Sequence, residues 1–238
     1  MDMRWSDTMC RSDRGGFSLI EVVFVLVILG IITTLAMQKS SDTSLYQARD
    51  QIISHMRYAQ HLAMSDDKYI GGTQLAPGVN RRAETEEWPK RLWRIQFHTI
   101  NNAAEGNIGE TYSVYSNSPT ASGAYNNNPM GYSSIARDPI SQKCLSYYNK
   151  NNLPSKCEDE RDNRLRLQKS FGITSVSMKS DCAANQRTIY FDYLGVPYCG
   201  GGSPKKLNSR AQITLTKGGQ SVAICVEPLT GYVHSCNN

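Results

Sequence analysis

Residues 17–37 of the 238-residue chain read FSLIEVVFVLVILGIITTLAM, an almost wholly apolar run. As a helix, its 21 residues are long enough to cross a hydrocarbon layer of about 30 Å. The run is longer than the apolar core of an ordinary secretory signal, and no small-residue cleavage site follows it at Met37–Ser41. The stretch therefore predicts a single transmembrane helix.

One acidic residue, Glu21, stands inside this apolar run, one helical turn from its start. A carboxylate costs roughly 3 kcal/mol at the centre of a bilayer and less near its interface. Glu21 either reaches the interface by itself or meets a positively charged partner once the protein assembles. It is the first candidate functional residue.

The residues around Glu21 read RGGFSLIE at positions 14–21 and lead into the apolar helix. This arrangement resembles the class III signal of type IV pilins and type II secretion pseudopilins. The resemblance implies that prepilin peptidase cleaves between Gly16 and Phe17, that the new amino group of Phe17 is N-methylated, and that Glu21 is required for assembly. It also implies other pilin or pseudopilin subunits and an inner-membrane assembly platform as partners.

A physical argument agrees with this resemblance. Cleavage before Phe17 leaves a cationic amino group at the start of the helix. A neighbouring subunit, shifted along a filament axis, can bring its Glu21 within reach of that amine. In a low dielectric the attraction is large, and pairing also removes an uncompensated charge. Such a helix is self-complementary only in a staggered array, which predicts filament growth out of a membrane.

The cysteines indicate the compartment of the C-terminal part. The chain has seven cysteines, six of which follow the apolar run, and none of these six lies in a CxxC pair. This spacing favours disulfides over a metal site, and therefore an oxidising compartment. Arginines and lysines flank both ends of the run, so charge alone orients it weakly. We expect an inner-membrane, single-pass protein with its N-terminus in the cytoplasm and its C-terminal domain in the periplasm, until it is extracted into the filament.

Six cysteines permit many pairings, and we predict that neighbours in sequence pair. Each such bridge closes a loop of about 12–18 residues, worth around 3 kcal/mol in the chain-entropy model. The last pair depends on hairpin register, which decides whether its two side chains face each other. The predicted pairs are Cys144–Cys157, Cys182–Cys199 and Cys225–Cys236.

The helical pattern continues beyond the apolar run. Apolar or small residues recur at steps of three or four, which marks one face of an α-helix. They are Leu45, Ala48, Ile52, Met56, Ala59 and Ala63. No proline interrupts residues 17–68, and Gly71-Gly72 marks the end. We predict a leader peptide over 1–16, one helix over 17–70 with a membrane half and an amphipathic half, and a linker over 71–91.

A β-rich periplasmic domain is expected over 92–238. Leu92–His98 and Thr111–Tyr115 alternate between apolar and polar residues, which predicts two half-buried antiparallel strands joined by a loop over Asn101–Gly109. The apolar side of the first strand carries Trp93, Ile95 and Phe97. Further short strands are predicted at Ile173–Met178, Thr188–Tyr193, Gln212–Thr216, Ser221–Val226 and Tyr232–Ser235. Gly218-Gly219 and Pro228–Gly231 fit hairpin turns between the last three.

Residues 116–170 show weak periodicity and predict a long insertion. Cys144 and Cys157 would staple it, and the charged stretch Glu158–Lys169 predicts a short exposed helix. An insertion of this kind either reads a specific partner or serves as a spacer.

A second resemblance concerns the end of the chain. The stretches FDYLGVP at 191–197 and ICVEPLTGYV at 224–233 resemble the ending of H-type pseudopilins and FimT-like minor pilins. This implies an α+β, pilin-like fold in which a β-sandwich or curled sheet clasps the helix stripe. Many major pilins carry proline where this chain has Gln38, so a minor subunit is favoured. The insertion and the six cysteines depart from the pattern and leave the subunit type open.

Enzyme motifs are absent from the sequence. The glycine-rich stretch Gly200–Lys206 lacks the spacing of a phosphate-binding loop, the four histidines are scattered, and no HExxH, GxSxG or GxGxxG occurs. We expect no enzymatic activity, no cofactor and no metal. The leading hypothesis is a minor subunit of a type II secretion, type IV pilus or DNA-uptake filament.

Two alternatives stay open. The first is a DNA-binding minor pilin: the net charge of +5 is mild, but the resemblance to FimT-like minor pilins implies a link to DNA uptake, and a set of basic residues, diluted by Glu84, Glu86 and Glu87, could contact phosphates. That basic set is Arg81, Arg82, Lys90, Arg91, Arg94, Lys205, Lys206 and Arg210. The second is a membrane-tethered periplasmic protein that does not polymerise.

Overall fold

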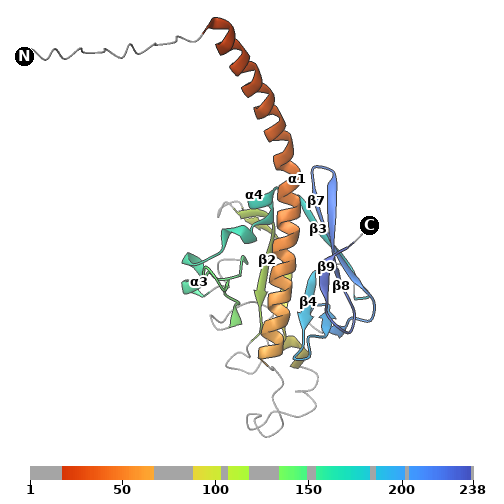
Figure 1. Ribbon diagram of the computed structural model, residues 1–238. Coiled ribbons are helices and arrows are strands. Elements are labelled where there is room, and N and C mark those ends of the chain that lie inside the picture. Colours follow the sequence, from red (N-terminus) through yellow and green to blue (C-terminus); the bar gives the residue numbers. More distant parts are fainter. Residues whose placement is uncertain are drawn as a thin grey trace, which may run out of the picture. The chain divides into compact units, whose positions relative to one another are not determined.

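The computed structural model describes residues 18–66, 88–102, 107–117, 134–148, 154–182, 186–201 and 204–236. A long N-terminal helix is followed by two antiparallel sheets, so the predicted α+β, pilin-like class is confirmed (Figure 1). The chain divides into two compact units, Met1–Ser41 and Asp42–Asn238, which are described separately below.

Helix α1 runs from Leu19 to Ser65. Ser18 precedes the helix. The backbone N–H of Glu21 lies 3.3 Å from the Ser18 Oγ and 3.0 Å from the Ser18 carbonyl oxygen. These contacts satisfy one of the backbone donors that have no partner within the first helical turn. The predicted leader, and residues 67–87 with most of the predicted linker, lie outside the described residues. In the described parts of the chain, none of the helices combines the length and the apolar character needed to cross a membrane.

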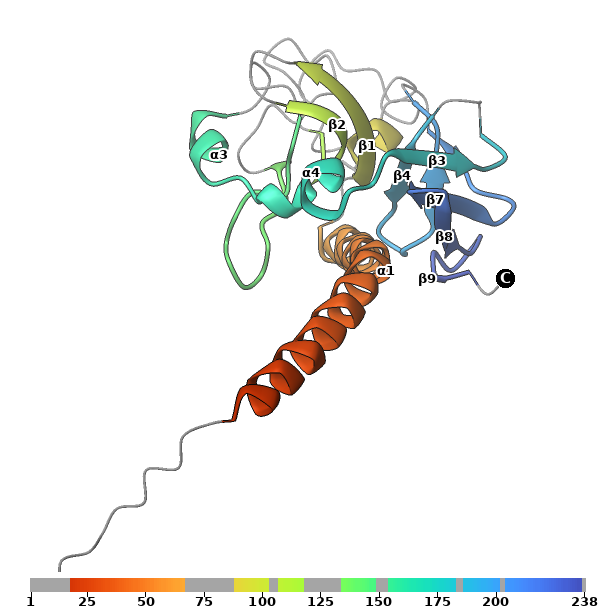
Figure 2. The same ribbon diagram turned by 90° about the horizontal axis from the view of Figure 1, so that it is seen from above.

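The predicted apolar stripe of α1 is confirmed within the second unit. Its six members, from Leu45 to Ala63, are at most 3% exposed and belong to one core cluster with apolar residues of both sheets. Figures 1 and 2 show this half of α1 lying along the sheets, with β2 on one side of it and β9 on the other. The apolar residues that alternate along the strands and those that recur at helical spacing along α1 therefore pack against each other in one core.

The first sheet has the strand order β2-β1-β4-β5-β6, and all its pairs are antiparallel. Its strands are β1 (Trp93–Asn102), β2 (Asn107–Tyr115), β4 (Thr188–Phe191), β5 (Pro197–Cys199) and β6 (Lys205–Lys206), and a 3₁₀ turn, η1 (Trp88–Arg91), precedes β1. The predicted loop over Asn101–Gly109 is wrong, because the β1–β2 ladder continues to the pair Asn102↔Asn107. Strands β5 and β6 were not predicted.

The second sheet has the order β3-β7-β8-β9. Its strands are β3 (Ser175–Lys179), β7 (Ala211–Lys217), β8 (Gln220–Val226) and β9 (Val233–Ser235). The β7–β8 hairpin turns at Gly218 and Gly219, whose φ angles of 54° and 81° suit a tight hairpin turn that non-glycine residues resist. Both predicted hairpin turns are confirmed.

The described parts of the insertion cover the outer edge of β2. Isolated bridges join Tyr115 to Ile135, Ser113 to Ser146 and Thr111 to Arg166. Three short helical segments follow along the chain: α3 (Ser155–Asp159), η5 (Asn163–Leu165) and α4 (Leu167–Phe171). The predicted exposed helix over Glu158–Lys169 is therefore wrong, because Leu165 and Leu167 are fully buried and draw this stretch into the core.

Candidate assembly surface

The first unit presents an apolar surface around its helix. Twelve large apolar side chains of this segment are between 42% and 84% exposed. They are Leu19, Ile20, Val22, Val23, Phe24, Val25, Leu26, Val27, Ile28, Leu29, Ile31 and Ile32. Contiguous apolar surface of this extent marks a site that another protein or a lipid phase covers. We call these residues the apolar surface of α1.

The hydroxyl groups of this segment are satisfied inside the helix. Thr33 Oγ1 donates to the Leu29 carbonyl at 2.8 Å, and Thr34 Oγ1 donates to the Gly30 carbonyl at 2.7 Å. Such back-bonding removes two polar groups from the need for outside partners. Between residues 18 and 38, Glu21 is the single charged residue.

Glu21 itself is exposed in the first turn of α1. A carboxylate there is favoured by the positive end of the helix dipole. Its side chain has no ion-pair partner within the described residues. The two other predicted processing residues, Gly16 and Phe17, lie outside the described part of the chain. The structure therefore places Glu21 but not the cleavage site or the amino group.

The structure places the sulfur atoms of all three predicted cysteine pairs at bonding distance. The Cα–Cα separations are 5.6 Å for Cys144–Cys157, 5.9 Å for Cys182–Cys199 and 5.2 Å for Cys225–Cys236. These separations fall in the range that disulfides require.

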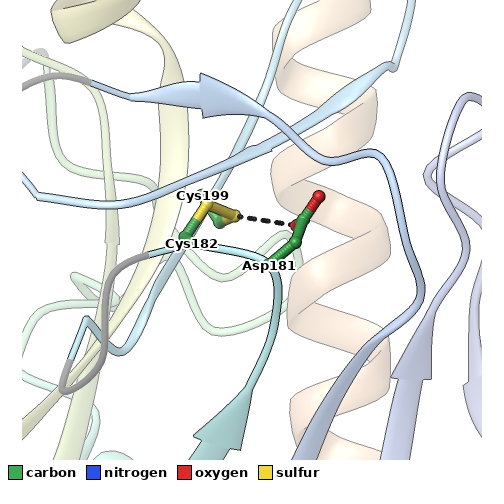
Figure 3. A group of neighbouring side chains, drawn as sticks. All are labelled: Asp181, Cys182 and Cys199. Carbon is green, nitrogen blue, oxygen red and sulfur yellow. Dashed lines mark hydrogen bonds between the residues drawn. A yellow bond between two sulfur atoms is a disulfide. The ribbon is translucent and has the colours of Figure 1, made fainter.

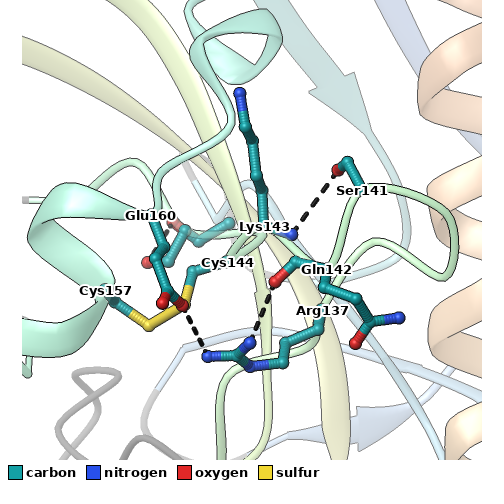
Figure 4. The surroundings of a disulfide bond; sticks show 9 residues. Arg137, Ser141, Gln142, Lys143, Cys144, Cys157 and Glu160 are labelled. Carbon is teal, nitrogen blue, oxygen red and sulfur yellow. Dashed lines mark hydrogen bonds and ion pairs between the residues drawn. A yellow bond between two sulfur atoms is a disulfide. The ribbon is translucent and has the colours of Figure 1, made fainter.

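Polar contacts surround the first of these disulfides (Figure 4). Arg137 donates to the Gln142 carbonyl at 3.0 Å and to the Glu160 carboxylate at 2.8 Å, while Cys144 joins Cys157 of α3. The hairpin around Arg137 is therefore fixed to the short helix of the insertion. These described residues of the insertion are thus packed against one another.

One group in the described residues has the composition of a metal site. Asp181, Cys182 and Cys199 offer ligand atoms within 4.8 Å of one another (Figure 3). Metal binding by cysteine needs the thiolate, and here the two sulfurs are joined to each other. Asp181 Oδ2 accepts the Asn208 N–H at 2.9 Å. With the disulfide formed, the group offers a metal ion a single ligand, the Asp181 carboxylate, one oxygen of which already accepts a hydrogen bond.

Among the described residues, not all of the basic side chains proposed to contact DNA lie at the surface. Arg81 and Arg82 lie outside the described residues, and Arg91 and Arg94 are only 4% and 1% exposed. Lys205 and Lys206 are exposed on β6. Arg210 pairs with Glu227 at 2.7 Å. A phosphate-contacting role for Arg91 and Arg94 is therefore wrong.

Arg94 is buried because aromatic rings take the place of water around it. Its guanidinium carbon lies 4.8 Å from the ring centroid of Tyr115 and 4.6 Å from that of Tyr190. Nη2 donates to the Lys90 carbonyl at 2.6 Å. Cation–π contacts of this kind stabilise a charge that has been removed from solvent. The outer face of β1 is thus covered, and the prediction of a half-buried strand is wrong on that side.

A buried polar network, which sequence reasoning missed, joins α1 to β2. Gln51 Nε2 donates to the Tyr112 hydroxyl at 2.7 Å, so the hydroxyl hydrogen is left for His55 Nδ1 at 2.8 Å. Burial lowers the pKa of His55 to about 4. Burial likewise raises the pKa of Tyr112. Both groups are therefore neutral at pH 7. Their hydrogen bonds hold α1 against β2 of the first sheet.

Comparison with known proteins identifies the N-terminal segment. No curated protein and no solved structure matches the chain. Residues 11–37 match the family described as "Prokaryotic N-terminal methylation motif". The match spans Gly16, Phe17 and Glu21, so residues 11–37 carry the class III signal of type IV pilin-like proteins, the signal that prepilin peptidase processes.

Proposed function

We propose that the chain is a minor pilin or pseudopilin that joins a periplasmic or surface filament of a type II secretion, type IV pilus or DNA-uptake system. Prepilin peptidase cleaves it between Gly16 and Phe17, and the new amino group of Phe17 is methylated. The observation that carries the proposal is Glu21, an exposed carboxylate and the lone charge on the apolar surface of α1, inside a matched methylation motif.

The proposed assembly step is an ion pair inside an apolar array. The Phe17 amine of one subunit approaches the Glu21 carboxylate of the next, while the apolar surfaces of their helices pack together. At a separation of 4 Å and an effective dielectric constant near 20, two unit charges attract by about 4 kcal/mol. An unpaired Glu21 in the same surroundings is destabilising, so wrongly staggered subunits are rejected.

Before assembly, we propose that the apolar segment anchors the protein in the inner membrane with the second unit in the periplasm. The membrane location is supported by the exposed apolar side chains of residues 19–32 and by the type of signal that the chain carries. The periplasmic location is supported by three cystine pairs, which persist in oxidising compartments. No catalytic role is proposed.

The first test is mass spectrometry of the mature protein from cells. We expect an N-terminal peptide that begins with methylated Phe17. A mature protein that still begins at Met1 contradicts the proposal.

The second test substitutes the assembly residue. Glu21→Gln keeps the shape of the side chain and removes its charge, so we expect normal cleavage but little incorporation into sheared or cross-linked filaments. Gln47→Ala, at an exposed position of the same helix, is the matched control and should incorporate normally. Normal incorporation of Glu21→Gln excludes the ion-pair mechanism.

The same experiments separate the alternatives. A chain that is cleaved and methylated but never recovered with filament subunits is a tethered periplasmic protein. DNA binding has less support, because Arg91 and Arg94 are buried.

A further inference from the structure

A polar hollow of about 280 Å³ opens at one end of the second sheet. It is lined by Lys179, Ser180 and Asp181, where β3 ends, and by Ser209, Arg210 and Gln212, where β7 begins. Lys179 and Gln212 are cross-strand partners, and partners project from the same face of a sheet. The opposite face carries the buried Ala211 and Ile213, so the hollow lies on the solvent side.

The two segments that line the hollow, residues 179–181 and 209–212, are its two walls, and each is held by a disulfide, hydrogen bond or ion pair. The disulfide Cys182–Cys199 ties the residues that leave β3 to strand β5. Asp181 Oδ2 accepts the backbone N–H of Asn208 at 2.9 Å, which holds the second wall against the first. Arg210 Nε pairs with Glu227 at 2.7 Å, which limits the motion of its side chain. A site held in this way loses little conformational freedom when it binds a ligand.

The hollow offers hydrogen-bond donors that nothing within the described residues uses. The Lys179 ammonium, the Ser209 hydroxyl and the Gln212 amide have no hydrogen-bond or ion-pair partner among those residues, and Arg210 pairs with Glu227 through its Nε. The lining carries two cations and one carboxylate, and that carboxylate already accepts the Asn208 N–H; the second carboxylate, that of Glu227, lies outside the lining. Charged donors converging on one space match the acceptor oxygens of an oxyanion.

We propose that this hollow binds an oxyanion, a phosphate or carboxylate group, between Lys179 and Arg210, with Ser209 and Gln212 as further donors. Its volume lies at the small end of ligand pockets, so it takes one anionic group or a small acid rather than a large organic ligand. The inference does not depend on the proposed role in filament assembly.

The test is titration of the full chain, ¹⁵N-labelled in neutral detergent micelles, with sodium phosphate or sodium acetate. Ionic strength is held constant with sodium chloride. We expect saturable amide shifts confined to residues 179–181 and 209–212. Removing both cations, in Lys179→Ala/Arg210→Ala, should weaken binding at least about tenfold, because each lost charged hydrogen bond costs about that much.

The matched control is Lys205→Ala/Lys206→Ala, which removes the same charge from the exposed strand β6 and should leave the affinity unchanged. Because Arg210 pairs with Glu227, its removal also breaks an ion pair of the fold. The single variant Lys179→Ala breaks no such pair, so it is measured as well and should weaken binding on its own. Saturable binding of either anion with this pattern supports the proposal, and the stronger of the two names the preferred group. Absence of saturable shifts with both anions, or equal losses in the two double variants, overturns it.

Discussion

The guanidinium of Arg187 lies 2.7 Å from the carboxylate of Glu110, and the same nitrogen donates to the Val176 carbonyl at 3.0 Å. Glu110 belongs to β2 of the first sheet, whereas Val176 belongs to β3 of the second. The other terminal nitrogen donates to Thr99 of β1 at 2.7 Å. A single side chain, placed just before β4, therefore ties the two sheets together.

We predict that Arg187→Met destabilises the protein by about 3 kcal/mol. The substitution leaves the Glu110 carboxylate, only 8% exposed, without its cation, and breaking one half of a buried pair is strongly destabilising. Urea unfolding of the full chain in detergent, followed by the fluorescence of its tryptophans, measures the loss. The pair Arg49–Asp50, in which the carboxylate is 63% exposed, provides the control: Arg49→Met leaves Asp50 in solvent and should cost less than about 1 kcal/mol. Similar losses in the two variants would contradict the role assigned to Arg187.

Two buried histidines predict that stability falls on mild acidification. Burial lowers the pKa of His55 to about 4 and that of His98 to about 3, against 6.5 in the unfolded chain. The unfolded state therefore binds more protons below pH 6.5, and unfolding becomes easier as the pH falls. A pKa difference of this size corresponds to about 3 kcal/mol for His55 between pH 7 and pH 4.

Urea midpoints between pH 7 and pH 4.5 measure this effect. His55→Gln and His98→Gln should each flatten the pH dependence, because the amide does not titrate in this range. His61→Gln, at an exposed position of α1, should leave the slope unchanged. A slope that both buried-site variants retain would assign the acid sensitivity to other groups.

A third prediction concerns Gly231, in the turn between β8 and β9. Its φ angle is +63°, and a Cβ atom there would overlap the Gly195 carbonyl oxygen, a backbone atom that cannot move away cheaply. Gly219 has φ +81° but open space around it. We expect Gly231→Ala to lower the free energy of unfolding by about 3 kcal/mol and Gly219→Ala by about 1 kcal/mol. In Gly219→Ala only the backbone conformation is unfavourable, whereas Gly231→Ala also creates a steric overlap. Thermal unfolding of the two variants checks this ranking, and equal costs would remove the argument from close approach.

Several elements of the fold could be predicted because their signals are local. The apolar run and the stripe from Leu45 to Ala63 follow helical spacing, and Gly218-Gly219 supplies the backbone freedom that a tight hairpin needs. The cysteine pairs are also short-range: the sequence separations are 13, 17 and 11 residues. Closure of such short loops is favoured over closure of long ones.

Other features depend on partners that are far away in sequence. Strands β5 and β6 are too short to show a period; β5 forms because β4 offers it an edge, and β6 forms on the edge of β5. The ladder that extends β1 and β2 across the predicted loop carries a bond between Thr99 and Glu110, which no periodicity reveals. On the outer face of β1, Arg94 is covered by Tyr115 of β2 and Tyr190 of β4, and His98 contacts Tyr148 of the insertion. The candidate site divides in the same way: Glu21 was visible in the sequence, whereas the burial of Arg91 and Arg94 was not.

The last prediction follows from the burial of Arg94. Its guanidinium is planar and lies over both Tyr115 and Tyr190, so we expect Arg94→Lys to destabilise the protein by about 2 kcal/mol although the charge is kept. Arg94→Leu removes the buried charge and its desolvation cost, so its loss should be no larger than that of lysine. Urea unfolding compares the two variants at pH 7. If Arg94 were instead a solvated surface cation, Arg94→Lys would leave the stability unchanged, and Arg94→Leu would lower it by exposing an apolar group. A stable lysine variant with a less stable leucine variant would therefore refute the stacked arrangement.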